Sequence, residues 1–316
     1  MKNETSVQYF YILPFSGETR SKPFITAFFF LIYVVGVLIN SSIITVICLE
    51  VQLHKPMYLF ICNLSNVDIF YTSVTVPKFL HMLLSGNHIV SSAQCYTQLS
   101  FFVTVGGAEE ILLFVMAYDR YFAICLPLHY HHIMSVRNCI LITIWIWAVA
   151  FINSSMFLTF VLYMSSCHSN IIHQFFCDPK SLTQTTCSTT QMFNVVNGVE
   201  TLVFAFIPLM GTVVSYVKIL SDNFKMKTKE SRKKSFSTCS SHVTVISIYY
   251  RAGLIGYLIP PYSDLLDSVF NIIYTTIVPM MNPIIYSLQN SNVQSALLVL
   301  LKGMDFIKID SRNVHR

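Results

Sequence analysis

Charged residues are scarce in this chain of 316 residues. Asp, Glu, Lys and Arg make up 11% of it, against about 25% in an ordinary soluble domain. Apolar residues make up 54%, Phe alone occurs 25 times, and the mean hydropathy is +0.59. So little charge cannot cover a water-facing surface, which argues against a soluble enzyme, a nucleic-acid binder and a disordered protein. The composition is that of an integral membrane protein.

Other absences narrow the class. The chain has no internal repeat, so a channel or transporter for small solutes, the alternative we consider, has little support. Residues 269–301 contain no lysine for a retinal Schiff base, which excludes an opsin. No metal-ligand or nucleophile motif accompanies the isolated Asp68 and His242, so we expect neither an enzyme nor an organic cofactor. The first 23 residues lack the pattern of a secretory signal, and the first apolar segment is expected to direct insertion.

Seven long segments carry almost no charge. A membrane helix needs about 20 mostly apolar residues to cross a hydrocarbon core about 30 Å thick. The segments cover residues 24–49, 57–84, 94–122, 139–163, 192–220, 237–259 and 269–288. We therefore predict an all-α membrane protein whose seven-transmembrane helix bundle occupies residues 24–288.

Basic residues indicate the orientation of the bundle. With the N-terminus outside, 14 of the 20 Lys and Arg residues fall in the inner loops and tail, as the positive-inside rule requires. This predicts an extracellular segment over residues 1–23 and a cytoplasmic tail over residues 289–316. Residues 293–301 are apolar and suggest a short amphipathic helix on the membrane surface. The basic stretch 225–234 is expected to contact either a G protein or anionic membrane lipid, and both readings stay open.

Cysteines and glycosylation sites agree with this orientation. Four of the nine cysteines lie in predicted outer regions, where disulfides persist, and four cysteines allow three pairings: Cys95, Cys167, Cys177 and Cys187. The Asn-x-Ser/Thr site at Asn3 is the one placed outside the spans, so a glycan is expected there.

Polar residues in the third segment share one helical face. Steps of four and three place these residues toward the bundle interior: Phe102, Gly106, Glu109, Leu113, Met116 and Arg120. Glu109 reaches a depth similar to that of Asp68. Two carboxylates at one depth indicate either a sodium site or a purely structural polar cluster with Asn40 and Asn282.

Ordered motifs occur along the chain, mostly at the inner ends of the spans. They are Leu53-His54-Lys55-Pro56-Met57-Tyr58, Leu64-Ser65-Asn66-Val67-Asp68, Met116-Ala117-Tyr118-Asp119-Arg120-Tyr121, Ser215-Tyr216, Phe236-Ser237-Thr238-Cys239-Ser240-Ser241-His242 and Pro279-Met280-Met281-Asn282-Pro283-Ile284-Ile285-Tyr286. As a set they resemble the olfactory receptors, seven-helix G-protein-coupled receptors of the rhodopsin-like class, over residues 24–302. Three positions depart from the family pattern: Ile39, Arg251 and Gln289.

The resemblance implies a signalling mechanism. Asp119 would hold Arg120 in the inactive state, and Arg120 would meet a heterotrimeric stimulatory G protein, raising cAMP, when the sixth helix swings outward. The residues implied in activation are Asp119, Arg120, Tyr121, Tyr216, His242, Asn282, Pro283 and Tyr286. The family pattern also implies the disulfides Cys95–Cys177 and Cys167–Cys187, which would pin a loop over the outer cavity.

The resemblance also implies a ligand cavity between the outer halves of the third, fifth, sixth and seventh spans. The candidates by position are Phe102, Val103, Gly106, Gly107, Glu200, Thr201, Phe204, Tyr250, Leu254, Tyr257 and Thr275. Their mostly apolar, aromatic character suits a small volatile odorant. Glu200 either attracts an amine, pairs with Arg251 or reaches water. Such a receptor is expected in the plasma membrane, as a multi-pass protein of an olfactory sensory neuron.

Overall fold

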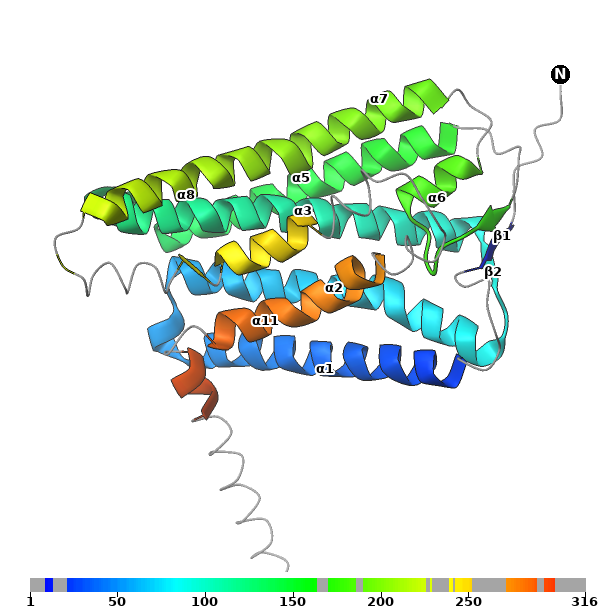
Figure 1. The fold of residues 1–316 in the computed structure, drawn as a ribbon, viewed down its shortest axis with the longest axis horizontal. Coiled ribbons are helices and arrows are strands. Elements are labelled where there is room, and N and C mark those ends of the chain that lie inside the picture. Colours follow the sequence, from blue (N-terminus) through cyan, green and yellow to red (C-terminus); the bar gives the residue numbers. More distant parts are fainter. Residues whose placement is uncertain are drawn as a thin grey trace, which may run out of the picture.

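The computed structural model describes residues 9–13, 22–163, 170–185, 190–225, 228, 239–240, 242–251, 271–288 and 293–298. These residues form a bundle of long helices that lie side by side along one axis (Figure 1). The first four long helices are α1 (Lys22–Leu49), α2 (Pro56–Ser85), α3 (Ser92–Cys125) and α5 (Val136–Tyr163). Two short helices, η2 (Val51–Leu53) and α4 (Pro127–Ile133), lie in the connections between them.

The fifth long helix is built from three consecutive segments. They are α7 (Thr190–Glu200), the π-helical η3 (Thr201–Phe206) and α8 (Ile207–Lys225). With this run, five helices of the described part are long and apolar enough to cross a membrane. This mostly helical architecture confirms the predicted class of membrane protein and is consistent with a seven-helix bundle.

The last two predicted spans are described in part. Residues 239–240 and 242–251 are helical within the sixth. In the seventh, the π-helical η4 (Ile273–Ile277) leads into α11 (Val278–Leu288), which contains Pro283. Residues 293–298 are helical as well.

Local sequence explains where the helices begin and end. At the start of α3, the Ser91 hydroxyl accepts a hydrogen bond from the Gln94 backbone N–H, and the Gln94 side chain accepts one from the Ser91 backbone. Such a capping box satisfies backbone donors that a helix leaves unpaired at its start. Pro56 begins α2, and Gly86, with φ of 69°, ends it in the left-handed conformation that glycine adopts without strain.

Helix α3 lies at the centre of the bundle and carries the site. It contacts α2, α5 and α8, and it is the most buried of the five membrane-length helices. By contrast, α5 exposes large apolar side chains, among them Trp145, Phe151 and Ile152. An exposed apolar face of this kind is the surface that a helix presents to lipid.

A small sheet closes one end of the bundle. Strand β1 (Tyr9–Ile12) pairs antiparallel with β2 (Ile89–Ser91) and parallel with β3 (Ile171–Ile172), in the order β2-β1-β3. Phe10 and Ile12 of β1 are fully buried. We predicted no strand in the N-terminal segment, because this strand is held by residues far along the chain rather than by a local pattern.

Candidate functional site

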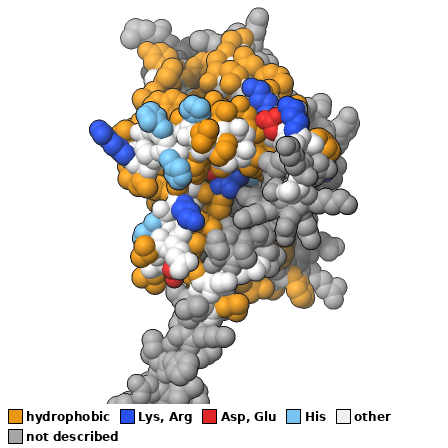
Figure 2. Space-filling model, turned by 90° about the vertical axis from the view of Figure 1, so that its left-hand side faces the viewer, with side chains coloured by type: hydrophobic (Ala, Val, Ile, Leu, Met, Phe, Trp, Pro, Cys, Tyr) orange, Lys and Arg blue, Asp and Glu red, His pale blue; other side chains and the backbone are white. Residues whose placement is uncertain are grey.

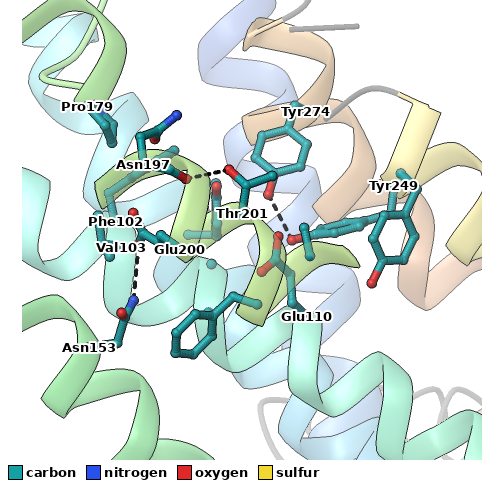
Figure 3. A pocket seen from close by; sticks show the side chains of 16 residues that line it. Phe102, Val103, Glu110, Asn153, Pro179, Asn197, Glu200, Thr201, Tyr249 and Tyr274 are labelled. Carbon is teal, nitrogen blue, oxygen red and sulfur yellow. Dashed lines mark hydrogen bonds between the residues drawn. The ribbon is translucent and has the colours of Figure 1, made fainter. Parts of the chain in front are cut away.

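A cavity of ≈ 180 Å³ lies between α3, η3 and the two C-terminal helical segments (Figure 3). Its lining combines six aromatic side chains with two carboxylates and two amides. The aromatic side chains are Tyr71, Phe102, Phe204, Tyr249, Tyr250 and Tyr274; the polar ones are Glu110, Asn153, Asn197 and Glu200. A small space lined by aromatic and other apolar side chains with a few polar groups is typical of a small-molecule site.

The structure brings eight of the eleven proposed ligand residues to this cavity. They are Phe102, Val103, Gly106, Gly107, Glu200, Thr201, Phe204 and Tyr250. Thr275 does not line it: its side chain is fully buried, and its hydroxyl donates a hydrogen bond to the Asn271 carbonyl at 2.7 Å. The neighbouring Tyr274, which lies in the same π-helical turn, lines the cavity instead. Leu254 and Tyr257 lie outside the described residues.

Glu110 is a lining residue that we did not predict from the sequence. Val103, Gly106, Gly107 and Glu110 are spaced by three, one and three positions, which places them on one face of α3. This spacing is the signal that would have found Glu110. From the sequence we considered the helical face that carries Glu109, which is rotated by about 100° from the face that carries Glu110.

The polar groups of the cavity are partly paired. The Asn153 side-chain amide donates a hydrogen bond to Glu200 Oε1 at 3.0 Å, and the hydroxyls of Tyr249 and Tyr274 lie 2.8 Å apart (Figure 3). One of the three alternatives for Glu200 is an ion pair with Arg251, and this ion pair is not found among the described residues. Glu200 is hydrogen-bonded to Asn153. Arg251 is exposed and does not line the cavity.

A second polar layer lies deeper, on another face of α3. The Asn282 amide donates to Asp68 Oδ1 at 2.9 Å, and the Asn40 amide donates to the Pro279 carbonyl at 3.3 Å. Asp68 Oδ2 and Glu109 Oε1 are buried and have no hydrogen-bond partner in the described part of the chain. Two orphaned carboxylate oxygens fit the oxygen ligands that a hard cation prefers. Among the described residues, no three His, Cys, Asp or Glu side chains lie close enough together to hold a metal ion. The sodium site at Asp68 and Glu109 stays a prediction.

An ion pair lies near the other end of α3. Arg120 Nη2 is 2.6 Å from Asp119 Oδ2, and the Tyr130 hydroxyl donates to Asp119 Oδ1 at 2.9 Å. Asp119 is only 1% exposed. Both carboxylate oxygens are therefore occupied, and Arg120 is held against its own helix.

The other residues proposed for activation surround this pair or lie in the polar layer. Tyr216 on α8 and His242 share a hydrogen bond that links the fifth and sixth spans. The Lys218 ammonium lies 5.5 Å from the centroid of the Tyr121 ring. Pro283 follows Asn282 in α11, and the side chain of Tyr286 lies outside the described residues.

A disulfide fixes the segment that covers the cavity. Cys95 of α3 is bonded to Cys177, as the family pattern implied. Beside it, the Gln98 amide donates to the Val74 carbonyl at 2.8 Å, and Gln98 Oε1 accepts from the Cys177 backbone N–H at 3.0 Å. This cover brings Pro179 to the cavity wall. The proposed Cys167–Cys187 disulfide and the glycosylation site at Asn3 lie outside the described residues.

Asp178, next to the disulfide, is a buried carboxyl of this cover. It is 2% exposed, and its Oδ1 accepts a hydrogen bond from the Ser181 backbone N–H at 3.3 Å at the start of α6 (Pro179–Gln184). Burial raises the pKa of Asp178 from 3.8 to about 6, against the opposing effects of its hydrogen bonds to Ser181 and the charge of Lys180.

The raised pKa of Asp178 makes the cover pH-sensitive. Because the folded state keeps its proton up to about pH 6 and the unfolded chain loses it near pH 3.8, stability falls as the pH rises through this window. The full cost, about 3 kcal/mol, applies above pH 6. We expect Asp178→Asn, which keeps the oxygen that accepts from Ser181, to raise the melting temperature of the purified protein at pH 7.4 much more than at pH 4. A gain that is equal at the two pH values would contradict this assignment.

The fold and the site together define a class. One central helix carries a small aromatic cavity near its start and a buried Asp-Arg pair near its end, inside a bundle of membrane-length helices. That is the arrangement of a G-protein-coupled receptor, a membrane receptor and not an enzyme.

Comparisons with known proteins identify the family. The family model described as olfactory receptor matches residues 29–303. The olfactory receptor-like protein OLF4 of Canis lupus familiaris is 37% identical over 305 residues, which cover 96% of this chain and 99% of that protein. Olfactory receptor 2L3 of Homo sapiens is 39% identical over 297 residues, which cover 93% and 95%. The chain belongs to the olfactory receptor family, which confirms the resemblance found in its motifs.

Proposed function

We propose that this chain is an odorant receptor that binds a small volatile molecule in the cavity beside α3 and activates a stimulatory, olfactory-type G protein that raises cAMP. The observation that carries the proposal is the placement of the aromatic cavity and the Asp119–Arg120 pair on one helix. Glu110 on the cavity wall and Arg120 are ten residues apart, about 15 Å along the helix axis. A ligand that shifts α3 against its neighbours would therefore also move the Asp119–Arg120 pair, because both lie on the same helix.

The signalling step follows from two packings of the same bundle. In the packing described here, Asp119 and Tyr130 hold Arg120, and the Tyr216–His242 hydrogen bond ties α8 to the sixth span. A ligand drives activation only to the extent that it binds the other packing more tightly. Opening the end of the bundle would release Arg120 from Asp119 and present it to the G protein.

The proposal includes the orientation and location of the receptor. The end of the bundle where α3 stops presents exposed basic residues and histidines (Figure 2). They include Lys55, Arg137, Lys218, Lys225, His129, His131 and His132. This end would face the cytoplasm, with the N-terminus outside and residues 293–298 along the membrane surface. The location would be the plasma membrane of an olfactory sensory neuron.

A substitution that fills the cavity tests the proposal. Gly107 faces Phe204, and a β-carbon on it would lie 3.5 Å from Phe204 Cδ1, so the larger side chain of Gly107→Leu would extend into the cavity. In cells that express the chain with an olfactory-type G protein, a panel of volatile odorants is expected to contain agonists. Gly107→Leu is expected to raise the agonist concentration for half-maximal cAMP by about tenfold or more.

The matched control is Gly198→Leu, because a β-carbon on Gly198 would meet no atom within 4 Å and Gly198 does not line the cavity. Surface labelling would establish that both variants reach the membrane. Equal responses of Gly107→Leu and Gly198→Leu to every agonist would rule out this cavity as the odorant site.

A further inference from the structure

Acidic side chains are the only charged groups in the described wall of the cavity. Glu110 comes from α3 and Glu200 from the end of α7, and the two lie within electrostatic range of each other. No Lys, Arg or His is found among the lining residues that the structure describes. The described wall of the cavity is therefore an aromatic surface whose only ionisable groups besides tyrosine are two acids.

The two carboxylates differ in how they are satisfied. Glu200 accepts the hydrogen bond of Asn153. Glu110 receives neither a hydrogen bond nor an ion pair from any residue in the described part of the chain, and its side chain rises toward the Tyr249–Tyr274 pair (Figure 3). A carboxylate away from bulk water is costly unless a partner pairs with it. A ligand with a positive charge would supply that partner.

Tyrosine rings surround the position that such a partner would take. The ring centroids of Tyr249 and Tyr274 are 5.2 Å apart, and those of Tyr249 and Tyr250 are 5.4 Å apart. Tyr250 lines the cavity and is 8% exposed, and its buried hydroxyl has no hydrogen-bond partner among the described residues. Aromatic faces attract ammonium groups, and an unpaired phenol oxygen accepts an N–H. This observation is independent of the carboxylates and points to the same ligand.

We infer that the cavity recognises a small protonated amine, with Glu110 as its counter-ion and Tyr249, Tyr250 and Tyr274 around the ammonium group. The small volume of the cavity and its aromatic wall suit a small alkylamine. The inference rests on the proposed function and gives its ligand class. Phe102, Phe204 and Val103 would contact the alkyl chain, and Glu200 would be a second acidic group in the same cavity.

Pairs of ligands with equal shape and different charge test the inference. Isopentylamine and isopentanol form one such pair, and cyclohexylamine and cyclohexanol form a second. In the cAMP assay, each amine is expected to act at a concentration about tenfold to hundredfold lower than its alcohol, as the loss of a charge-assisted hydrogen bond predicts. Glu110→Gln is expected to remove that difference. The matched control Glu50→Gln, outside the cavity at the end of α1, is expected to keep it.

Direct binding separates this inference from the signalling proposal. Isothermal titration of the purified full chain in lipid nanodiscs, with isopentylamine as the probe, is expected to show binding that Glu110→Gln weakens by about tenfold or more and Glu50→Gln leaves unchanged. Such binding without any cAMP response would support the amine site and overturn the proposed G protein. Alcohols that activate while amines neither bind nor activate would overturn the amine site and leave the odorant receptor intact. No binding of either amine would also overturn it.

Discussion

Cells that express Arg120→Ala are expected to show no ligand-driven rise in cAMP, although the receptor reaches the surface and still binds ligand. Arg120 does not line the cavity, so its removal leaves every ligand contact in place. In the proposed mechanism, Arg120 is the cation that this end of α3 offers to the G protein, and alanine cannot replace it. We expect no cAMP response at agonist concentrations up to at least about a hundredfold above those that activate the unsubstituted receptor. The measurement is cAMP accumulation normalised to surface label.

The partners of Arg120 are expected to act in the opposite direction. Asp119→Asn removes the charge that holds Arg120 at 2.6 Å, and Tyr130→Phe removes only the hydrogen bond to Asp119 Oδ1. Ligand-free cAMP is expected to rise about tenfold in the first variant and less in the second, because a charge-assisted contact is worth more than a neutral one. A normal agonist response of Arg120→Ala, or unchanged basal cAMP of Asp119→Asn, would contradict the mechanism.

Cys177→Ser is expected to remove most of the receptor from the cell surface, to less than about a tenth of the wild-type amount. The Cys95–Cys177 bond joins residues separated by 82 positions and holds the cover against α3. Loss of such a bond costs about 2–5 kcal/mol, a large part of the stability of a folded protein. Once the bond is gone, only noncovalent contacts hold this segment, among them the hydrogen bond from the Cys177 backbone N–H to Gln98 Oε1 and the ring contact between Phe176 and Phe102. The measurement is surface label per cell, with total protein measured in parallel.

Two variants make this result specific to the disulfide. Cys48→Ser changes an exposed free cysteine on α1 and is expected to keep the wild-type amount at the surface. The double variant Cys95→Ser/Cys177→Ser is expected to match either single variant, because both single changes remove the same bond. A double variant that is far worse than either single one would show that the cysteines act separately.

Most of the helical bundle follows from local sequence. The predicted spans 57–84 and 139–163 correspond to α2 (Pro56–Ser85) and α5 (Val136–Tyr163), because a run of apolar residues specifies a membrane helix by itself. Hydropathy did not predict the π-helical segments η3 and η4. A π-helical turn holds one residue more than an α-helical turn, and both are equally apolar in a membrane span. Tyr274, which lines the cavity where we predicted Thr275, lies in η4.

The cavity was predictable only where one helix determines it. Glu110 lies on the same face of α3 as Val103 and Gly107, so periodicity alone would place it there. Asn153 is different: in the sequence it is a polar residue inside a span, and its contact with Glu200 exists only because the fold brings this part of α5 close to the end of α7. Pairings between distant segments are set by tertiary packing, which one sequence does not encode locally.

The strand β1 has a consequence for the order in which the receptor is completed. Tyr11 pairs with Ile89 and with Ile171, which the ribosome adds 78 and 160 residues later. At about 5–20 residues per second, Phe10 and Ile12 wait about 8–30 s for the last strand of their sheet. During that interval β1 is an apolar segment with open edges, which can pair with other chains. The sheet can close as soon as Ile172 has been added, before the residues of α7, α8 and α11, so this end of the bundle can be fixed while its last helices are still being made.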